Sequence, residues 1–349
     1  MKRLTRKNKQ KYNTANLKSK TVTKKHSGGS SVSGGVSGGN LENGGNKTWK
    51  TKSCSPIVEN ATVSHETCYT PRDIIAVKNS YNNAHPTNKI EEKEPEKIIK
   101  ELKEEIKNCN NEMCWLDEIK NPQLKKELTE KSFAPKHPEK WNSSPNEWLS
   151  NIDISKVINQ YEKKYKNFKF IGPSAIDFDT VLGDNKCVNQ DLCKIDLKHY
   201  IQHRKNKIGV IFNLDKHDQS GSHWVAMFID LEHKFFFYFD SANNLIPPEI
   251  KNLTNKIHKQ SKDLGLHLKY YDNQNITHQQ SNTECGMYSL FFIVTMLTGK
   301  VHFNKQSTLF NKTKHKTKYF SVKGRISLFK HQRIPDKYVE KYRKIYFNS

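Results

Sequence analysis

The stretch QQSNTECGMYSLFFIVTML, residues 279–297, decides how the rest of the chain is interpreted. Its second part, which begins at Gly286, is almost entirely apolar and predicts a helix that is buried on nearly all sides. Its first part is a polar loop that ends at Cys285. The thiol is therefore expected at a helix N-terminus, where the helix dipole and unpaired N–H groups favour the thiolate. A buried structural cysteine is the alternative for an isolated residue, but Gln279 and Gln280 supply amide donors beside this one.

Short apolar runs before this loop predict strands at residues 208–212, 224–231 and 235–239. Their apolarity is continuous rather than alternating, which indicates strands that are covered on both faces. A helix that opens at Pro248 and a strand at 266–271 follow them. Three strands, a helix, a strand and a buried helix predict an α+β domain.

A further helix is predicted to begin at Ser144, because Ser144-Pro145-Asn146-Glu147 has the pattern of a capping box with proline at the first helical position. Trp148 follows directly. The apolar residues that then keep the spacing of one helix face are Ile154, Val157, Ile158 and Tyr161. A short strand is expected after this helix, at residues 168–171.

His223 lies where a hydrophilic loop meets the second apolar run, and Asp240 ends the third run after five consecutive aromatic residues. A turn near His233 joins the two predicted strands, so antiparallel pairing brings the start of one beside the end of the other. His223 and Asp240 are therefore expected within reach of each other. A histidine oriented by a carboxylate and placed beside a thiol is the arrangement of nucleophilic catalysis. The competing carboxylates, none of which lies opposite the histidine in this pairing, are Asp215, Asp218 and Asp230.

These residues together resemble the papain-like cysteine proteases that process ubiquitin-like modifiers. The resemblance covers about residues 148–299 and depends on elements that recur in order: His223-Trp224, Phe239-Asp240-Ser241, Gln279, and Asn282-Thr283-Glu284-Cys285-Gly286. It implies a papain-like core with a central mixed sheet and the nucleophile at the N-terminus of a buried helix. The roles that it implies are Cys285 as nucleophile, His223 as base, Asp240 as its orienting carboxylate and Gln279 as oxyanion donor.

The same resemblance implies substrate-binding residues and a branch of the clan. The segment from Glu147 to Asn151 resembles the tryptophan-bearing helix that these enzymes place near the substrate groove, so Trp148, Trp224 and Asn282 are expected to bind substrate. Where the modifier proteases have a Pro-Asn pair, this chain has Ser281-Asn282, which leaves Gln280 as an alternative to Gln279. The run up to Cys285 is closer to the viral proteases of the clan, including the African swine fever type.

The composition of the 349 residues changes along the chain. Residues 1–52 are basic with a single acid, Glu42, and hold half of the glycines as four Gly-Gly pairs between Gly28 and Gly45. Pro95 can open an amphipathic helix further on. The expected organisation is a disordered basic Gly/Ser-rich tail over 1–52, a helical accessory region over 53–136, a catalytic domain over 137–320 and a basic C-terminal extension over 321–349. The net charge of +23 favours either weak nucleic-acid binding through the basic ends or a merely solubilising tail.

The seven cysteines contain no Cys-x-x-Cys pair, so neither a structural zinc site nor a secreted disulfide scaffold is expected. Cys109 with Cys114, and Cys187 with Cys193, lack the histidines that would complete a metal site. No metal or organic cofactor is implied. No signal peptide and no apolar run of membrane-spanning length is visible. The chain is therefore expected in a reducing compartment, in the virion or the host cytoplasm, without a membrane partner.

Three functions follow from this interpretation. The first is a viral cysteine endopeptidase that cleaves structural precursor proteins after Gly-Gly sites. The second is a protease that removes SUMO-like modifiers, which would need a folded modifier docked on its surface. The third is a catalytically inactive fold that serves as a virion scaffold or a nucleic-acid-binding protein. The four Gly-Gly pairs of the tail are either sites of self-cleavage or an ordinary linker.

Overall fold

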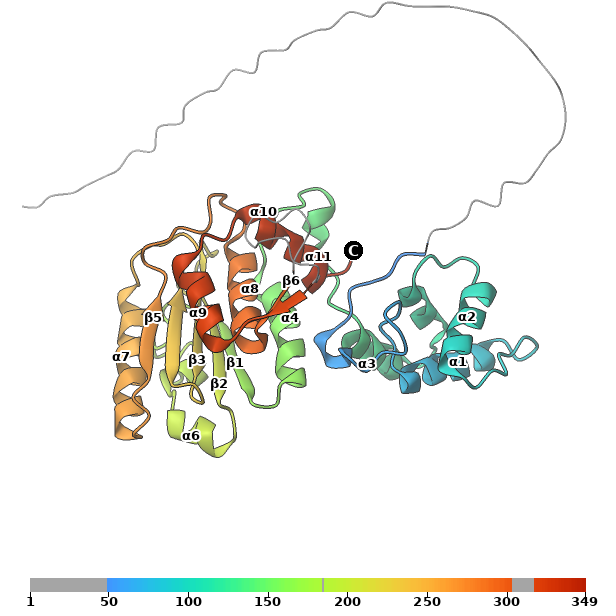
Figure 1. Cartoon of the computed structure of the whole chain (residues 1–349), viewed down its shortest axis with the longest axis horizontal. Helices are drawn as coiled ribbons and strands as arrows, with labels where there is room; N and C mark the ends of the chain where they lie inside the picture. The colour runs from blue at the N-terminus through green and yellow to red at the C-terminus, as the bar shows by residue number, and fades with distance from the viewer. Residues whose placement is uncertain (1–48, 184, 303–316) are drawn as a thin grey trace, which may run out of the picture. The chain divides into compact units, whose positions relative to one another are not determined.

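The computed structural model describes residues 49–183, 185–302 and 317–349. Most of the tail predicted over residues 1–52, with all four Gly-Gly pairs, lies outside the described residues. Residues 47–349 form one compact unit. The unit contains a central sheet with helices on both faces and a separate group of helices at its N-terminal side (Figure 1).

The central sheet has five strands in the order β1-β2-β3-β4-β5. They are β1 (Phe168–Ala175), β2 (Lys207–Asn213), β3 (Trp224–Asp230), β4 (Phe235–Phe239) and β5 (Lys269–Asp272). The outer pairs, β1 with β2 and β4 with β5, are parallel, whereas β3 is antiparallel to both of its neighbours. The α+β class with a mixed sheet is therefore confirmed. The last strand begins three residues later than predicted.

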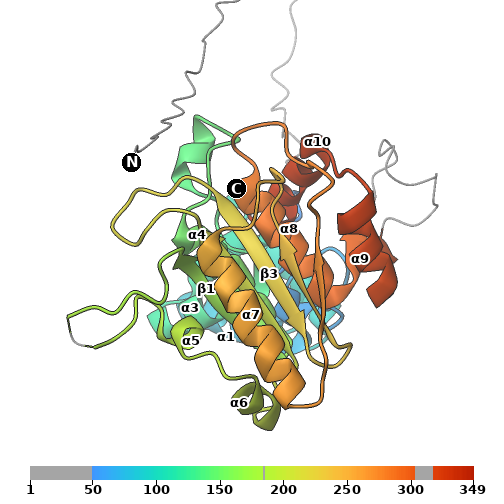
Figure 2. The ribbon, with the colours of Figure 1, turned by 90° about the vertical axis from the view of Figure 1, so that its left-hand side faces the viewer.

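Every residue of β3 and β4 is buried, as the continuous apolar runs predict. Side chains alternate between two cores, because successive residues of a strand point to opposite faces. Trp224, Ala226 and Phe228 face the core that contains helix α8 (Cys285–Thr298). Val225, Met227 and Ile229 face the core of helix α7 (Pro248–Asp263). Figure 1 shows α7 on one side of the sheet with α8 and α4 (Asn151–Lys164) on the other, and Figure 2 shows α7 crossing in front of β3.

Helix α8 is buried over all of its residues from Cys285 to Leu297, as its composition predicts. It ends at Gly299, whose backbone has φ 71° and is left-handed. A Cβ at this glycine would lie 2.7 Å from the carbonyl oxygen of Phe320. Gly299 therefore allows the chain to leave the buried helix and approach the segment that follows the second, two-stranded sheet, β6 (Lys300–His302) and β7 (Thr317–Tyr319).

The region predicted to be helical before residue 136 contains α1 (Pro71–Ala84), α2 (Pro95–Glu105) and α3 (Pro122–Ser132). Each begins with a proline at its first position, where the missing N–H costs nothing. The apolar face predicted for α2 is buried at Ile98, Ile99 and Leu102 in a third core that this region forms with its own side chains. Among the described residues, the 3-10 helices before α4 are η1 (Pro56–Val58), η2 (Glu112–Glu118) and η3 (Glu139–Asn142). The short helices α5 (Gln190–Cys193) and α6 (Leu197–Gln202) precede β2.

The segment predicted as a basic C-terminal extension is helical. It comprises α9 (Val322–His331), α10 (Asp336–Val339), η4 (Glu340–Tyr342) and α11 (Arg343–Tyr346). Its apolar side chains, from Leu328 to Phe347, belong to the same core as α8. The high lysine content after residue 320 obscures this packing, because lysines on the outer face of a helix leave its inner face free to be apolar. That residues 137–320 and 321–349 are separate parts of the chain stays a prediction.

The capping box predicted at Ser144 is wrong. Helix α4 begins at Asn151 and is capped by Ser150, whose hydroxyl accepts from the N–H of Asp153 while that aspartate accepts from the Ser150 N–H. The carbonyls of Asn146 and Glu147 instead accept hydrogen bonds from Arg343, and that of Glu147 also from the indole of Trp141. Both stretches match the capping pattern, so tertiary partners decide between them. Trp148 consequently lies in a non-helical segment before α4.

The expectation of reduced cysteines is also wrong for this structure. Three disulfides pair Cys54 with Cys68, Cys109 with Cys114 and Cys187 with Cys193. Their Cα–Cα distances of 5.1, 5.9 and 6.2 Å lie in the usual disulfide range. Folding, rather than sequence spacing, brings these partners together. Among the described residues Cys285 is the free cysteine.

Candidate active site

Cys285 is the first residue of α8 and is 2% exposed. The next residue, Gly286, packs closely against Leu149 and Trp224. A side chain at this position would crowd both, because its Cβ would lie 3.1 Å from Leu149 Cβ and 3.3 Å from Trp224 Cδ1. The residue before Cys285, Glu284, is the N-cap but makes no side-chain cap hydrogen bond. The N–H groups of the first turn therefore remain for other acceptors near the thiol.

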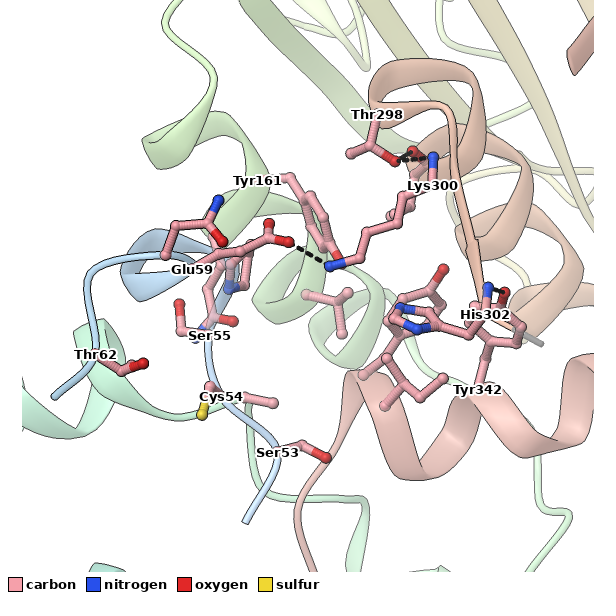
Figure 3. Close-up of a pocket in the computed structure, with 18 of the residues that line it drawn as sticks. Ser53, Cys54, Ser55, Glu59, Thr62, Tyr161, Thr298, Lys300, His302 and Tyr342 are labelled. Carbon is pink, nitrogen blue, oxygen red and sulfur yellow. Dashed lines mark hydrogen bonds and ion pairs between the residues drawn. The ribbon is translucent and has the colours of Figure 1, made fainter. Parts of the chain in front are cut away.

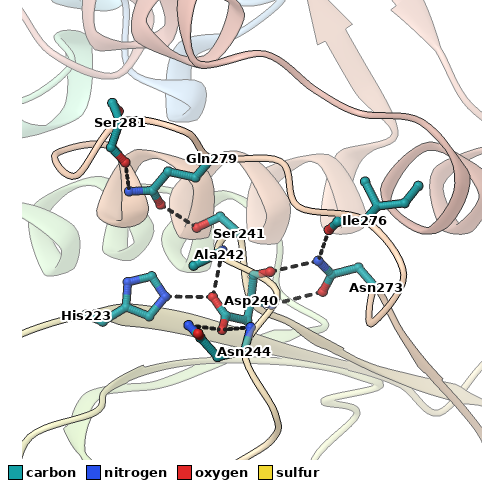
Figure 4. Close-up of polar contacts among 9 residues, drawn as sticks. All are labelled: His223, Asp240, Ser241, Ala242, Asn244, Asn273, Ile276, Gln279 and Ser281. Carbon is teal, nitrogen blue, oxygen red and sulfur yellow. Dashed lines mark hydrogen bonds and ion pairs between the residues drawn. The ribbon is translucent and has the colours of Figure 1, made fainter. Parts of the chain in front are cut away.

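His223 directly precedes β3, and Asp240 directly follows β4. The observed register, in which Ala226 pairs with Phe239, brings these two strand ends together as predicted. His223 Nε2 lies 2.6 Å from Asp240 Oδ1, as Figure 4 shows. The second ring nitrogen, Nδ1, is left for another partner, and Cys285 lies near enough to the imidazole to raise the pKa of His223.

The carboxylate of Asp240 is 1% exposed and is held by four hydrogen bonds. Its Oδ1 accepts from His223 and from the N–H of Ala242 at 2.9 Å, and its Oδ2 accepts from the N–H and the side-chain amide of Asn244 at 2.9 and 3.0 Å. Burial raises the pKa of Asp240, but the hydrogen bonds and the charge of His223 offset this effect and lower the pKa below its usual range. The carboxylate is thus ionised at neutral pH and faces the imidazole.

The charge balance of His223 follows from the same contacts. Burial by itself lowers the pKa of His223, whereas hydrogen bonds with Asp240 and Cys285 and the charges of both raise it, with a net result of about 10. A protonated imidazole next to a thiol stabilises the thiolate. The arrangement can therefore hold a thiolate–imidazolium pair.

Gln279 lies beside Ser241, the residue that follows Asp240, as Figure 4 shows, and is 8% exposed. Its Oε1 accepts from the hydroxyl of Ser241 at 2.7 Å, and its Nε2 donates to the carbonyl of Ser281 at 2.6 Å. The amide orientation is determined, because a carbonyl oxygen can only accept. One hydrogen of the NH₂ group remains for a further acceptor. Gln280 is exposed and uses its backbone N–H on Asp336, which supports Gln279 over Gln280 as the residue of the site.

The predicted substrate-binding tryptophans line one cleft of about 580 Å³. Trp148 is 36% exposed and Trp224 is 7% exposed. The indole Nε1 of Trp224 donates to the carbonyl of Leu149 at 3.0 Å, so Trp224 also holds the segment that carries Trp148. Asn282 is exposed on the loop before Cys285 and is not among the residues that line this cleft.

Comparison with known proteins accounts for this arrangement. The model of the Ulp1 protease family, C-terminal catalytic domain, matches residues 153–326, which include the histidine, aspartate, glutamine and cysteine described above. A putative thiol protease of Acanthamoeba polyphaga mimivirus is 33% identical over 206 residues, which are 58% of this chain and 66% of that protein. The SUMO-1 cysteine protease of African swine fever virus is 29% identical over 220 residues, 56% of this chain and 78% of that protein.

This chain belongs to the Ulp1 protease family through residues 153–326. It is therefore a cysteine-type peptidase, a hydrolase, and its curated relatives named above are viral cysteine proteases. The chain spans about two thirds of the length of the mimivirus protein.

The crystal structure of the African swine fever virus protease shares the fold, with a TM-score of 0.55 and 21% identity over 86% of this chain and 97% of that one. The overlap is larger than residues 137–349 alone could supply, so it includes part of the N-terminal helical region. The fold likeness thus extends beyond the segment that the Ulp1 family model matches.

Sequence reasoning missed the residues that support the Ulp1-type site. The amide of Asn273, 3% exposed, accepts from the Asp240 N–H at 3.0 Å and donates to the Asp240 carbonyl at 2.7 Å. Asn244 completes the bonds to the carboxylate. Neither asparagine stands in a recognisable motif, because turn asparagines occur throughout this Asn-rich chain.

A second cavity, of about 380 Å³, lies apart from these groups (Figure 3). It is lined by residues of the N-terminal region, α4, α8 and the C-terminal segment. Two of its charged side chains, Glu59 and Lys300, form an ion pair with each other. His223, Asp240 and Cys285 are not among its lining residues. None of the described helices is both long and apolar enough to cross a lipid bilayer.

Proposed function

We propose that this Ulp1-family peptidase cleaves polypeptides after Gly-Gly-type sites, with Cys285 as nucleophile, His223 as acid and base, Asp240 as the carboxylate that orients His223, and Gln279 as an oxyanion donor. The observation that supports this most strongly is the 2.6 Å contact between His223 Nε2 and Asp240 Oδ1, with Cys285 at the start of the buried helix and near enough to the imidazole to raise the pKa of His223.

In this mechanism the Cys285 thiolate attacks the carbonyl carbon of the scissile bond, and its negative charge moves to the carbonyl oxygen. The remaining amide hydrogen of Gln279 and the N–H of Cys285 stabilise that oxygen. Nδ1 of the His223 imidazolium then gives its proton to the leaving amine, and a thioester remains. The neutral imidazole next removes a proton from water, which attacks the thioester, and the acid product leaves with the thiolate and imidazolium regenerated.

The preference for Gly-Gly is supported by the match to the Ulp1 protease family and by the relative from African swine fever virus, which bears the name SUMO-1 cysteine protease. Leu149 and Trp224 approach Gly286 so closely that even a methyl group there would meet them at 3.1 and 3.3 Å. Trp148 and Trp224 line the adjoining cleft. The wall beside Cys285 is therefore tightly packed, and the peptide assay below tests which residues the site accepts.

The experiment is to incubate the purified chain and its Cys285→Ala variant with Gly-Gly-X and matched Ala-Ala-X peptides, and to identify products by mass spectrometry. We expect cleavage after Gly-Gly by the unchanged chain, and none by Cys285→Ala or on the alanine peptides. Equal cleavage of both peptides would contradict the Gly-Gly preference. Cleavage by the folded Cys285→Ala variant would contradict the assignment of the nucleophile.

Removal of SUMO-like modifiers is the second candidate, because the relative from African swine fever virus bears the name SUMO-1 cysteine protease. It is distinguished by adding folded SUMO-like fusions that end in Gly-Gly to the same assay. Cleavage of fusions but not of short peptides would favour modifier removal. Cleavage of short peptides at a comparable rate would favour the processing of precursor proteins, which we propose as the role in the virion or the host cell.

A further inference from the structure

The C-terminal segment, residues 321–349, contacts the loop that leads to Cys285 at three places. We call residues 278–284 the nucleophile loop. At its start, the buried ring of His278 accepts from the Ile334 N–H at Nδ1, 3.1 Å, and donates from Nε2 to the carbonyl of Phe329, 3.0 Å. Both ring nitrogens are used, so His278 has a structural task and no hydrogen left for chemistry.

In the middle of the nucleophile loop, one carboxylate fixes two consecutive peptide groups. Asp336 Oδ2 accepts from the N–H groups of Gln280 at 3.1 Å and Ser281 at 2.9 Å. The hydroxyl of Tyr288, on α8, donates to Asp336 Oδ1 at 2.9 Å. The bonds from Asp336 fix the two peptide groups that directly precede the Ser281 carbonyl, which is the acceptor that orients the amide of Gln279.

At the end of the nucleophile loop, Arg343 joins two parts of the site. Its Nη2 lies 2.8 Å from Glu284 Oε1, with Glu284 fully buried and Arg343 7% exposed. It also donates to the carbonyls of Asn146 and Glu147 at 3.3 and 3.1 Å, immediately before Trp148. The guanidinium lies 4.3 Å from the ring centre of Trp141. One side chain therefore connects the residue before the nucleophile to the segment that carries the cleft tryptophan.

We propose that Asp336 and Arg343 are positioning residues for the peptidase reaction, which hold the nucleophile loop and the Trp148 segment in the arrangement that Cys285 and Gln279 require. Both residues lie beyond residue 326, where the match to the family model ends. This inference rests on the proposed function where it is tested by peptide cleavage. A second test, alkylation of Cys285, does not require peptidase activity.

The reason for a chemical test is electrostatic. Glu284 is adjacent to Cys285, and its carboxylate is buried, so a charge left there without Arg343 would oppose formation of the thiolate. The charged groups near the thiol are His223, which is paired with Asp240, and Glu284, which is paired with Arg343.

The chemical test measures the rate at which iodoacetamide alkylates Cys285 as a function of pH, by mass spectrometry of the peptide that contains it. For Arg343→Met we expect at least tenfold slower alkylation at pH 6, with the pH profile displaced to higher pH. The double variant Glu284→Gln/Arg343→Met removes both charges and should return the profile towards that of the unchanged chain. The exposed Lys341, in the same segment, provides the control Lys341→Ala, which should change nothing.

If Arg343→Met does not fold, Arg343→Lys replaces it. The lysine keeps the charge beside Glu284 but cannot reach all three carbonyl and carboxylate partners, so the alkylation profile should stay while cleavage weakens. A profile for folded Arg343→Met that superimposes on that of Lys341→Ala would overturn the role of Arg343.

The kinetic test uses the Gly-Gly-X peptide. Asp336→Ala should lower kcat at least tenfold with KM within threefold, whereas Asp336→Asn, which keeps one acceptor for the loop amides, should retain most of kcat. Active sites are counted by alkylation, so that a misfolded fraction does not enter kcat. An unchanged kcat per active site in Asp336→Ala would overturn the role of Asp336. If the unchanged chain cleaves no peptide, the proposed function fails, and the alkylation profiles alone decide the positioning role.

Discussion

His223 is the residue whose protonation controls the proposed chemistry. Burial opposes its charge, but the Asp240 carboxylate on Nε2 and the neighbouring Cys285 raise its pKa to about 10. The imidazolium should therefore persist as pH rises, and kcat/KM should fall only as pH passes through about 10. Asp240→Asn removes one anion, lowers the pKa of His223 and should move this alkaline limb to lower pH by at least one unit.

The measurement is kcat/KM against pH, with the pH profile of Cys285 alkylation as a parallel readout. A second buried carboxylate, Asp230, lies 3.0 Å from His233 Nδ1 at the turn between β3 and β4, so Asp230→Asn serves as the matched control and should leave the limb in place. An alkaline limb that does not move in Asp240→Asn would contradict the assigned source of the pKa shift.

Gly286 follows the proposed nucleophile and also packs against Leu149 and Trp224 in the core. Gly286→Ala would place a methyl group 3.1 Å from Leu149 Cβ and 3.3 Å from Trp224 Cδ1, so both neighbours must shift. We expect the free energy of unfolding to fall by about 1–2 kcal/mol and kcat/KM to decrease, measured by denaturant unfolding and peptide cleavage. Gly183, whose Cβ would meet nothing within 4 Å, gives the control Gly183→Ala. Equal free energies of unfolding for the two variants would show that Leu149 and Trp224 can move away from the added methyl group without loss of stability.

At the scale of elements, helix α8 carries a matched pair of threonines. Thr295 is fully buried, and its hydroxyl has no hydrogen-bond partner among the described residues. Thr298 donates to the Val294 carbonyl at 2.8 Å and accepts from the Lys300 N–H at 3.0 Å. Thr295→Val should therefore raise the free energy of unfolding by about 1 kcal/mol, whereas Thr298→Val should lower it by about 1–2 kcal/mol. Denaturant unfolding of both variants checks this, and destabilisation by Thr295→Val would indicate a bound water or partner at that hydroxyl.

The elements differ in how well sequence predicts them. The strands from β2 to β4 and helix α8 were predictable, because their residues are buried on both faces and their composition shows it directly. The contact of His223 with Asp240 was predictable from the turn between two such strands. The start of α4 was not, because Ser144 and Ser150 both begin a capping pattern and only Arg343, nearly 200 residues later, separates them. Asp336 and Arg343 could not be found either, since no motif connects them to the loop that they contact.

At the scale of the whole molecule, Asn348 connects chain segments that are far apart in sequence. Its Oδ1 accepts from the Ser53 N–H at 2.7 Å, and its Nδ2 donates to the carbonyls of Ser53 and Ala134 at 2.8 and 2.9 Å. It is 4% exposed, so water can replace little of this bonding. The predicted accessory region, 53–136, is therefore attached to Asn348 through the backbone of Ser53, its first residue, and of Ala134, near its end.

Asn348→Ala tests whether this attachment makes the accessory region and the rest of the unit unfold together. Three hydrogen bonds are lost, and the Ser53 N–H and the Ala134 carbonyl lose this partner, while the Ser53 carbonyl still accepts from the Ala134 N–H. The loss should cost about 3 kcal/mol and lower the midpoint of thermal unfolding by about 5–10 °C. Calorimetry is the measurement, and Lys344→Ala, an exposed side chain one turn earlier, is the control. If the regions are independent folding units, as the predicted boundary at residue 136 implies, the variant should instead keep the main transition and shift only a smaller one. A single transition displaced as a whole would show that the Asn348 contacts make residues 49–349 one cooperative structure, in which the helices before the catalytic domain stabilise the C-terminal segment that holds the nucleophile loop.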